Sequence, residues 1–136
     1  MSFGSLHESA ISKWGLTDLV DKIAAKAVVV TAAGNCDFNF IFWPARLESV
    51  LAVGATDDTG SQRWTTGSLG SGQCAILGQL QNVQVDAGSS WGQEVDLAAP
   101  ASGTSFAAPQ VAAMAAILKA RSPNLSGATL RAALLD

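Results

Sequence analysis

The 136-residue sequence has few charged residues, one histidine and two cysteines. Charged residues make up 14% of the chain, against about a quarter in an ordinary soluble domain, whereas hydrophobic residues make up 49%. The length is enough for one domain. So much apolar surface with so little charge fits a membrane protein, a subunit with large interfaces, or a part of a larger core.

The absence of long apolar runs and of basic clusters excludes two classes of partner. A membrane-spanning helix needs about twenty consecutive apolar residues. The longest candidate, Phe106 to Leu118, contains Pro109 and Gln110. The net charge is −3, and the scattered Lys and Arg form no basic patch. We therefore expect neither a membrane nor a nucleic acid as partner.

The scarcity of histidine and cysteine limits metal sites and disulfides. His7 alone cannot form a histidine metal cluster. Cys36 and Cys74 allow one disulfide but no four-ligand metal site. The two thiols could pair or remain free and buried, and we favour free thiols.

Three apolar runs predict strands of a parallel sheet. They lie at Val28–Val30, at Val50–Ala55 and within "EVDLAAP". Continuous apolar runs of this kind are typical of strands that are buried on both faces. "MSFG" at the start of the sequence could be the end of a fourth strand.

Helical spacing of apolar residues predicts helices that alternate with these strands. One runs from about Leu16 to Ala24 with Thr17 as its cap, and Ser5 and Glu8 form a capping box before it. A second runs from about Ser105 to Lys119, and a third covers Ala128 to Leu134 after the cap Ser126. The residues expected to face inward from the second helix are Val111, Met114, Ile117 and Leu118. The alternation predicts an α/β layer architecture.

Residues 67–88 fit this scheme poorly. They begin rich in Gly and Ser and end in the alternation Val83, Val85. We expect an insertion there, made of a loop and a hairpin.

Ser105 lies where a strand and a short loop meet the start of a helix. Backbone N–H groups at such a point are unpaired, and the helix dipole favours negative charge. Gly103, Ala107 and Ala108 would allow a substrate to approach closely. Two interpretations remain open on this local pattern: a nucleophile, or an N-cap serine on an alanine-rich helix.

The segment around Ser105, "GTSFAAPQVAA", resembles the active-serine motif of the subtilisin-like serine proteases, the subtilases or peptidase S8 family. Four other segments resemble that family in the same order: "MSFG", "VVVTAAGN", "WPARLESVLAVGATD" and "SSWGQEVDLAAP". The resemblance covers nearly the whole chain apart from 67–88. It implies that 1–136 is the C-terminal half of a catalytic domain, with an incomplete, parallel-sheet, three-layer α/β fold.

The resemblance also implies roles for individual residues. Ser105 matches the nucleophile, and Asn35 matches the side-chain donor of the oxyanion hole. Ser2, Phe3 and Gly4 match the strand that pairs with the substrate backbone. Ala32, Ala33 and Gly34 match one wall of the specificity pocket, where small residues would leave room for a large side chain.

The catalytic base and its orienting aspartate are not found in this sequence. In the family both precede the segment that "MSFG" resembles, in the order Asp, His, Ser. We expect His7 to serve as a surface or capping residue. We expect the "DDTG" of Asp57–Gly60, which imitates the aspartate motif, to be a turn.

These observations leave three hypotheses for the function. The first is a serine endopeptidase fragment that acts on polypeptides, is inactive alone and needs the missing N-terminal half as its partner. The second is a pseudoenzyme or peptide-binding module. The third is a sedolisin, whose Ser-Gly-Thr-Ser motif is similar, but the family's oxyanion residue is an aspartate and this chain has Asn35.

No cofactor is required by the resemblance, although some relatives bind a metal. A weak Ca²⁺ or Na⁺ site could form from Asp96 with backbone oxygens near Ala45 and Val50, and an ordinary polar strand end is the simpler interpretation. The resemblance alone suggests secretion.

Overall fold

A parallel three-stranded sheet forms the centre of the molecule. The computed structural model describes Met1, Ser5 and residues 7–68 and 86–136. The strands are β1 (Val30–Ala32), β2 (Leu51–Thr56) and β5 (Leu97–Pro100), in the order β1-β2-β5. All three predicted strands are confirmed, although β1 begins at Val30 rather than at Val28.

Strand β2 is the core of the sheet. Its residues from Leu51 to Ala55 are all buried, as the continuous apolar run predicts for a strand covered on both faces. Val53 pairs with Ala32 on one side and with Leu97 on the other. The two flanking strands therefore depend on β2 for both their hydrogen bonds and their packing.

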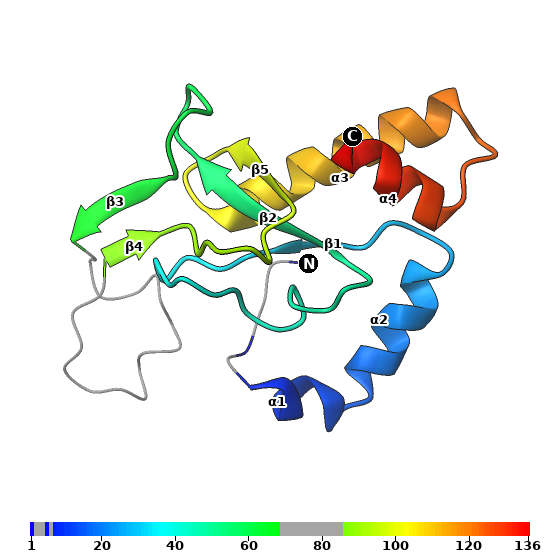
Figure 1. Ribbon diagram of the computed structural model, residues 1–136, viewed down its shortest axis with the longest axis horizontal. Coiled ribbons are helices and arrows are strands. Elements are labelled where there is room, and N and C mark those ends of the chain that lie inside the picture. Colours follow the sequence, from blue (N-terminus) through cyan, green and yellow to red (C-terminus); the bar gives the residue numbers. More distant parts are fainter. Residues whose placement is uncertain (2–4, 6, 69–85) are drawn as a thin grey trace.

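Helices lie on two sides of this sheet. Helices α3 (Thr104–Arg121) and α4 (Gly127–Leu135) lie above the strands in Figure 1, and α1 (Glu8–Ser12) and α2 (Leu16–Ala24) lie below them. Helix α3 packs against all three strands. This arrangement confirms the predicted layers of helix, sheet and helix. No helix in the described part of the chain is long and apolar enough to cross a membrane.

The start of the chain extends the sheet beyond β1. The Met1 nitrogen donates to Val30 O at 2.5 Å, and Ala32 N donates to Met1 O at 2.9 Å. We expected "MSFG" to form the end of a fourth strand, and Met1 is the part of this segment that the structure describes. Ser2, Phe3 and Gly4 themselves lie outside the described residues.

Two of the predicted helix caps are wrong, and one is confirmed. Helix α2 has Gly15 as its N-cap, with a φ of 65° that suits glycine, so Thr17 lies inside the helix. Helix α1 has His7 as its N-cap, and Ser5 Oγ only accepts from His7 N at 3.2 Å. In α4, Ser126 Oγ accepts from Thr129 N at 3.1 Å, as expected of a cap.

A second, two-stranded sheet flanks the segment where we expected an insertion. Strands β3 (Thr65–Ser68) and β4 (Asp86–Gly88) pair in antiparallel fashion. The alternating valines Val83 and Val85 lie outside the described residues, as does Cys74. Cys36 is disulfide-bonded, so our preference for free thiols is wrong.

Helix α3 is apolar on two sides, and only one side packs against the sheet. Val111 is buried as expected, together with Ala107, Ala108 and Ala115. Met114 is 57% exposed and Ile117 is 56% exposed, so the expectation that they face inward is wrong. We call the residues Phe106, Met114 and Ile117 the outer face of α3. The helical spacing of apolar residues did not predict which side of α3 is buried, because both sides of the helix carry apolar residues.

We expect Leu51→Ala to lower the free energy of unfolding by about 2–5 kcal/mol, because Leu51 is fully buried between two layers. Ile117→Ala is the matched control on the outer face, and its effect should stay within about 0.5 kcal/mol. Urea unfolding followed by tryptophan fluorescence measures both. An equal loss in the two variants would contradict the exposed position of Ile117.

Candidate functional site

Ser105 lies in the first turn of α3, half-buried, just after a tight turn. The N-cap is Gly103, whose φ of 123° is a conformation that other residues rarely adopt. The interpretation of Ser105 as the N-cap is therefore wrong. As a residue of the first turn, its N–H has no acceptor within the helix. The Gln110 side chain donates to Pro100 O at 2.8 Å and so ties this turn to the end of β5.

Asn35 follows the end of β1 and lies against the turn that precedes Ser105. Its Oδ1 accepts from Thr104 N and from Thr104 Oγ1, both at 2.9 Å. A backbone N–H can only donate, so this contact identifies the amide oxygen and leaves Nδ2 available to donate elsewhere. The structure thus holds Asn35, which was predicted as catalytic, against Thr104, the residue directly before Ser105.

Thr104 joins these two segments, and our sequence reasoning did not single it out. Its side chain is 1% exposed, and Oγ1 also accepts from Gly34 N at 3.2 Å. One hydroxyl therefore serves both Gly34 and Asn35. The sequence could have pointed to Thr104, because this residue directly precedes Ser105 in the motif "GTS".

Ala32, Ala33 and Gly34 lie in a packed part of the structure. Ala33 is fully buried and Ala32 nearly so. A Cβ at Gly34 would overlap the ring of Phe42 and would lie 3.2 Å from Ser90 Oγ. We expected room for a large side chain beside these small residues, and at Gly34 the Phe42 ring occupies that space.

Ser105 has no base beside it in the described part of the chain. No group there forms a hydrogen bond with Ser105 Oγ. His7 is exposed at the start of α1, on the other side of the sheet from α3 (Figure 1). It is the N-cap residue of α1, but its side chain makes no capping hydrogen bond, so of the two expected roles the structure supports that of a surface residue.

The "DDTG" segment is a turn, as expected. Gly60 N donates to Asp57 O at 3.0 Å, and the Asp57 carboxylate accepts from Thr59 Oγ1 at 2.8 Å. The Thr59 hydroxyl lowers the pKa of Asp57, with smaller contributions from the N–H groups of Gln62 and Ser61. These bonds stabilise the turn and point to no catalytic role.

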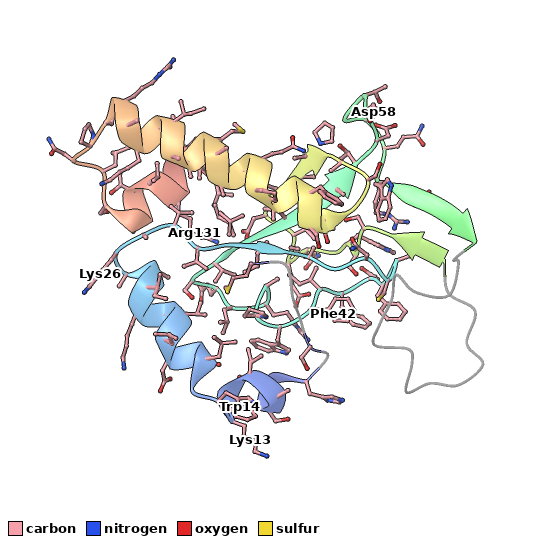
Figure 2. The ribbon with its side chains drawn as sticks, turned by 180° about the vertical axis from the view of Figure 1, so that it is seen from behind. Lys13, Trp14, Lys26, Phe42, Asp58 and Arg131 are labelled. Carbon is pink, nitrogen blue, oxygen red and sulfur yellow. The ribbon has the colours of Figure 1, made fainter. Side chains whose placement is uncertain are left out.

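The Asp96 carboxylate holds a cationic side chain. Its Oδ2 accepts from Ala52 N at 2.8 Å, and its Oδ1 accepts from Arg131 Nη2 at 3.2 Å. The same Nη2 lies 3.4 Å from Val50 O. Figure 2 shows the Arg131 side chain reaching from α4 toward the sheet. The guanidinium thus contacts two of the oxygens from which we expected a weak cation site.

We expect Thr104→Val to lower the free energy of unfolding by about 1–3 kcal/mol, because it leaves the N–H of Gly34 without an acceptor. Thr104→Ser keeps the hydroxyl and loses one methyl group, at a cost of about 0.8 kcal/mol. Guanidinium chloride unfolding distinguishes the two. Equal losses would mean that the hydroxyl contributes nothing beyond packing.

The chain is similar to known proteins over nearly its whole length. The family model described as "Subtilase family" matches residues 1–136. M-protease of Shouchella clausii is 32% identical over 132 residues, which cover 96% of this chain and 32% of the relative. Subtilisin BL of Lederbergia lenta is also 32% identical over 132 residues, which cover 96% of this chain and 45% of the relative.

The fold of the chain is also similar to that of a solved structure. The crystal structure of a cold adapted subtilisin-like serine proteinase matches with a TM-score of 0.65 at 25% identity, over 96% of this chain and 44% of that one. The chain therefore spans less than half the length of these relatives. Its fold is an incomplete α/β subtilisin fold, and the chain belongs to the subtilase family of serine proteases.

Proposed function

We propose that this chain supplies the nucleophile and the oxyanion hole of a serine endopeptidase. Ser105 attacks the carbonyl of a peptide bond, and the oxyanion is stabilised by Asn35 Nδ2 and the Ser105 N–H. The observation that carries the proposal is the anchoring of Asn35 Oδ1 by Thr104 N at 2.9 Å. This bond turns the donor end of the amide away from Thr104 and holds it beside the first turn of α3.

The general base and its orienting aspartate come from a partner segment that corresponds to the N-terminal half of the catalytic domain. Without a base, a serine hydroxyl is a poor nucleophile at neutral pH. The outer face of α3 supports such a partner, since Phe106 is 69% exposed and lies on the same helix as Ser105. Covering this face would bring the partner segment next to the nucleophile.

A polypeptide is the substrate in this proposal. Met1 already pairs with Val30 and Ala32 of β1, so Met1 lies at the edge of the sheet beside β1. Ser2, Phe3 and Gly4 are proposed to form backbone hydrogen bonds with the substrate there. Such pairing recognises the main chain of a peptide and depends little on its side chains.

The alternative function is that of a peptide-binding pseudoenzyme. It is favoured by the absence of any hydrogen bond to Ser105 Oγ among the described residues. A groove without a base would bind peptides and release them uncut. Secretion is proposed for either function, because the disulfide at Cys36 suits an oxidising compartment.

We expect cleavage when the chain is mixed with the N-terminal part of Subtilisin BL, up to the segment that this chain matches. Fluorogenic peptide hydrolysis measures it, and Ser105→Ala should abolish it. Ile117→Asp should also prevent it by placing a charge on the outer face, whereas Ile23→Asp, at an isoleucine of α2 that is 46% exposed, should not.

Two results decide between the functions. The endopeptidase proposal is falsified if no N-terminal segment that associates with the chain yields hydrolysis dependent on Ser105. Saturable binding of a peptide to the chain alone, by calorimetric titration, would then support the pseudoenzyme. A flat titration would remove the pseudoenzyme.

We further propose that Arg131 supplies the positive charge at Asp96 and that Ca²⁺ or Na⁺ competes there only weakly. Arg131→Gln should lower the melting temperature, and millimolar CaCl₂ should raise it again, because a carboxylate and carbonyl oxygens then remain as ligands. CaCl₂ should leave the unmodified chain and Arg46→Gln, a change in an exposed ion pair, unaffected. An equal calcium response in all three would contradict the role of Arg131.

A further inference from the structure

The Phe42 ring fills the space beside Gly34. Gly34 has a φ of 113°, and a Cβ there would overlap the ring. Phe42 is 3% exposed, and its N–H donates to Ala33 O at 3.3 Å. Figure 2 shows Phe42 below the strands, on the side away from α3. The backbone bond and the ring contact together hold Phe42 against the wall of small residues.

Other aromatic rings hold Phe42 in this position. The Phe40 ring meets it edge-on, with centroids 5.9 Å apart, and the Phe38 ring lies 6.3 Å away. Phe38 and Phe40 stack on each other at 4.9 Å. Phe42 is therefore part of a packed cluster, and moving its ring aside would disrupt several favourable contacts.

This filled space lies next to the proposed oxyanion donor. Gly34 directly precedes Asn35, and Gly34 N is bonded to Thr104 Oγ1, one residue before the nucleophile. In the proposed binding mode, the carbonyl of the substrate lies at Ser105 and Asn35, and the side chain on the acyl side of the cleaved bond lies beside Gly34. The Phe42 ring occupies that space.

We propose that Phe42 is a specificity-determining residue that restricts the substrate residue on the acyl side of the cleaved bond to glycine, alanine or serine. Protein interiors are close-packed, so the ring and a second large side chain cannot share this space. The proposal rests on the proposed endopeptidase function and defines its substrate class.

Serine is included because of Ser90. Its Oγ is buried, has no hydrogen-bond partner among the described residues and lies 3.2 Å from the position of a Cβ on Gly34. Ser90 N is bonded to Gly34 O at 2.8 Å, which fixes its backbone at the wall. A hydroxyl on a small substrate side chain would give this buried group a partner.

A binding experiment tests the filled space without catalysis. In Phe42→Ala the missing ring should leave an apolar cavity that binds toluene, as such cavities bind small aromatics. Toluene should shift the amide NMR signals of Gly34 and Ser90 in this variant, but not in the unmodified chain. Phe40→Ala is the control, because it removes a ring of the same cluster, whereas the ring nearest a Cβ at Gly34 is that of Phe42. Phe42→Val is the second variant if Phe42→Ala does not fold.

A cleavage experiment tests the specificity. In the complex with the N-terminal segment, substrates with alanine should be cleaved roughly a hundredfold faster, as kcat/KM, than substrates with phenylalanine at this position. Phe42→Ala should reverse this preference, and Phe40→Ala should keep it. Efficient cleavage after phenylalanine by the unmodified chain would overturn the proposal, as would toluene binding at Gly34 while Phe42 is present.

Failure of the two proposals can be told apart. If no variant cleaves and toluene still binds only to the Phe42 variants, the endopeptidase proposal is contradicted, but the observation that Phe42 occupies the space beside Gly34 is supported. Cleavage without any preference for small residues would remove the role of Phe42 alone.

Discussion

The hydroxyl and amide of Thr104 connect the end of β1 to the start of α3, and the geometry of the candidate site depends on this connection. Buried polar groups must find partners, and here Gly34, Asn35 and Thr104 satisfy one another. The bond from Thr104 N also uses an N–H that the first helical turn cannot satisfy itself. Two segments that lie far apart in the sequence are thereby held in one orientation.

The packing of α3 explains the unusual composition. One side of the helix covers β2 with small residues such as Ala107 and Ala108, so the helix lies close to the sheet. The other side, the outer face, is just as apolar and carries Met114 and Ile117 in exposed positions. A chain with 14% charged residues therefore has apolar surface that its described residues leave uncovered. Among the three interpretations of the composition, a part of a larger core agrees best with a chain shorter than half of its relatives.

Much of the fold followed from local patterns. The apolar runs predicted the three strands within a few residues. A strand covered on both faces needs such a run, and this holds for β1 and β2, whereas β5 is only partly buried. Ser126 was recognised as a cap, and Asp57–Gly60 as a turn, because both depend on bonds within a few residues. Thr17 was wrongly chosen as a cap because Gly15, with a positive φ, competes for the same end of the helix.

The sequence by itself determined the strands and the order of the motifs, and it indicated Asn35 and Ser105 as candidate catalytic residues. These depend on local spacing and on residue type. Only the tertiary structure decided which side of α3 is buried, that Cys36 forms a disulfide, and that Arg131 contacts Asp96. It also decided that Phe42 occupies the space beside Gly34. Each of these depends on which distant segments come together, and small residues such as Ala33 and Gly34 do not reveal whether the space beside them is open or filled.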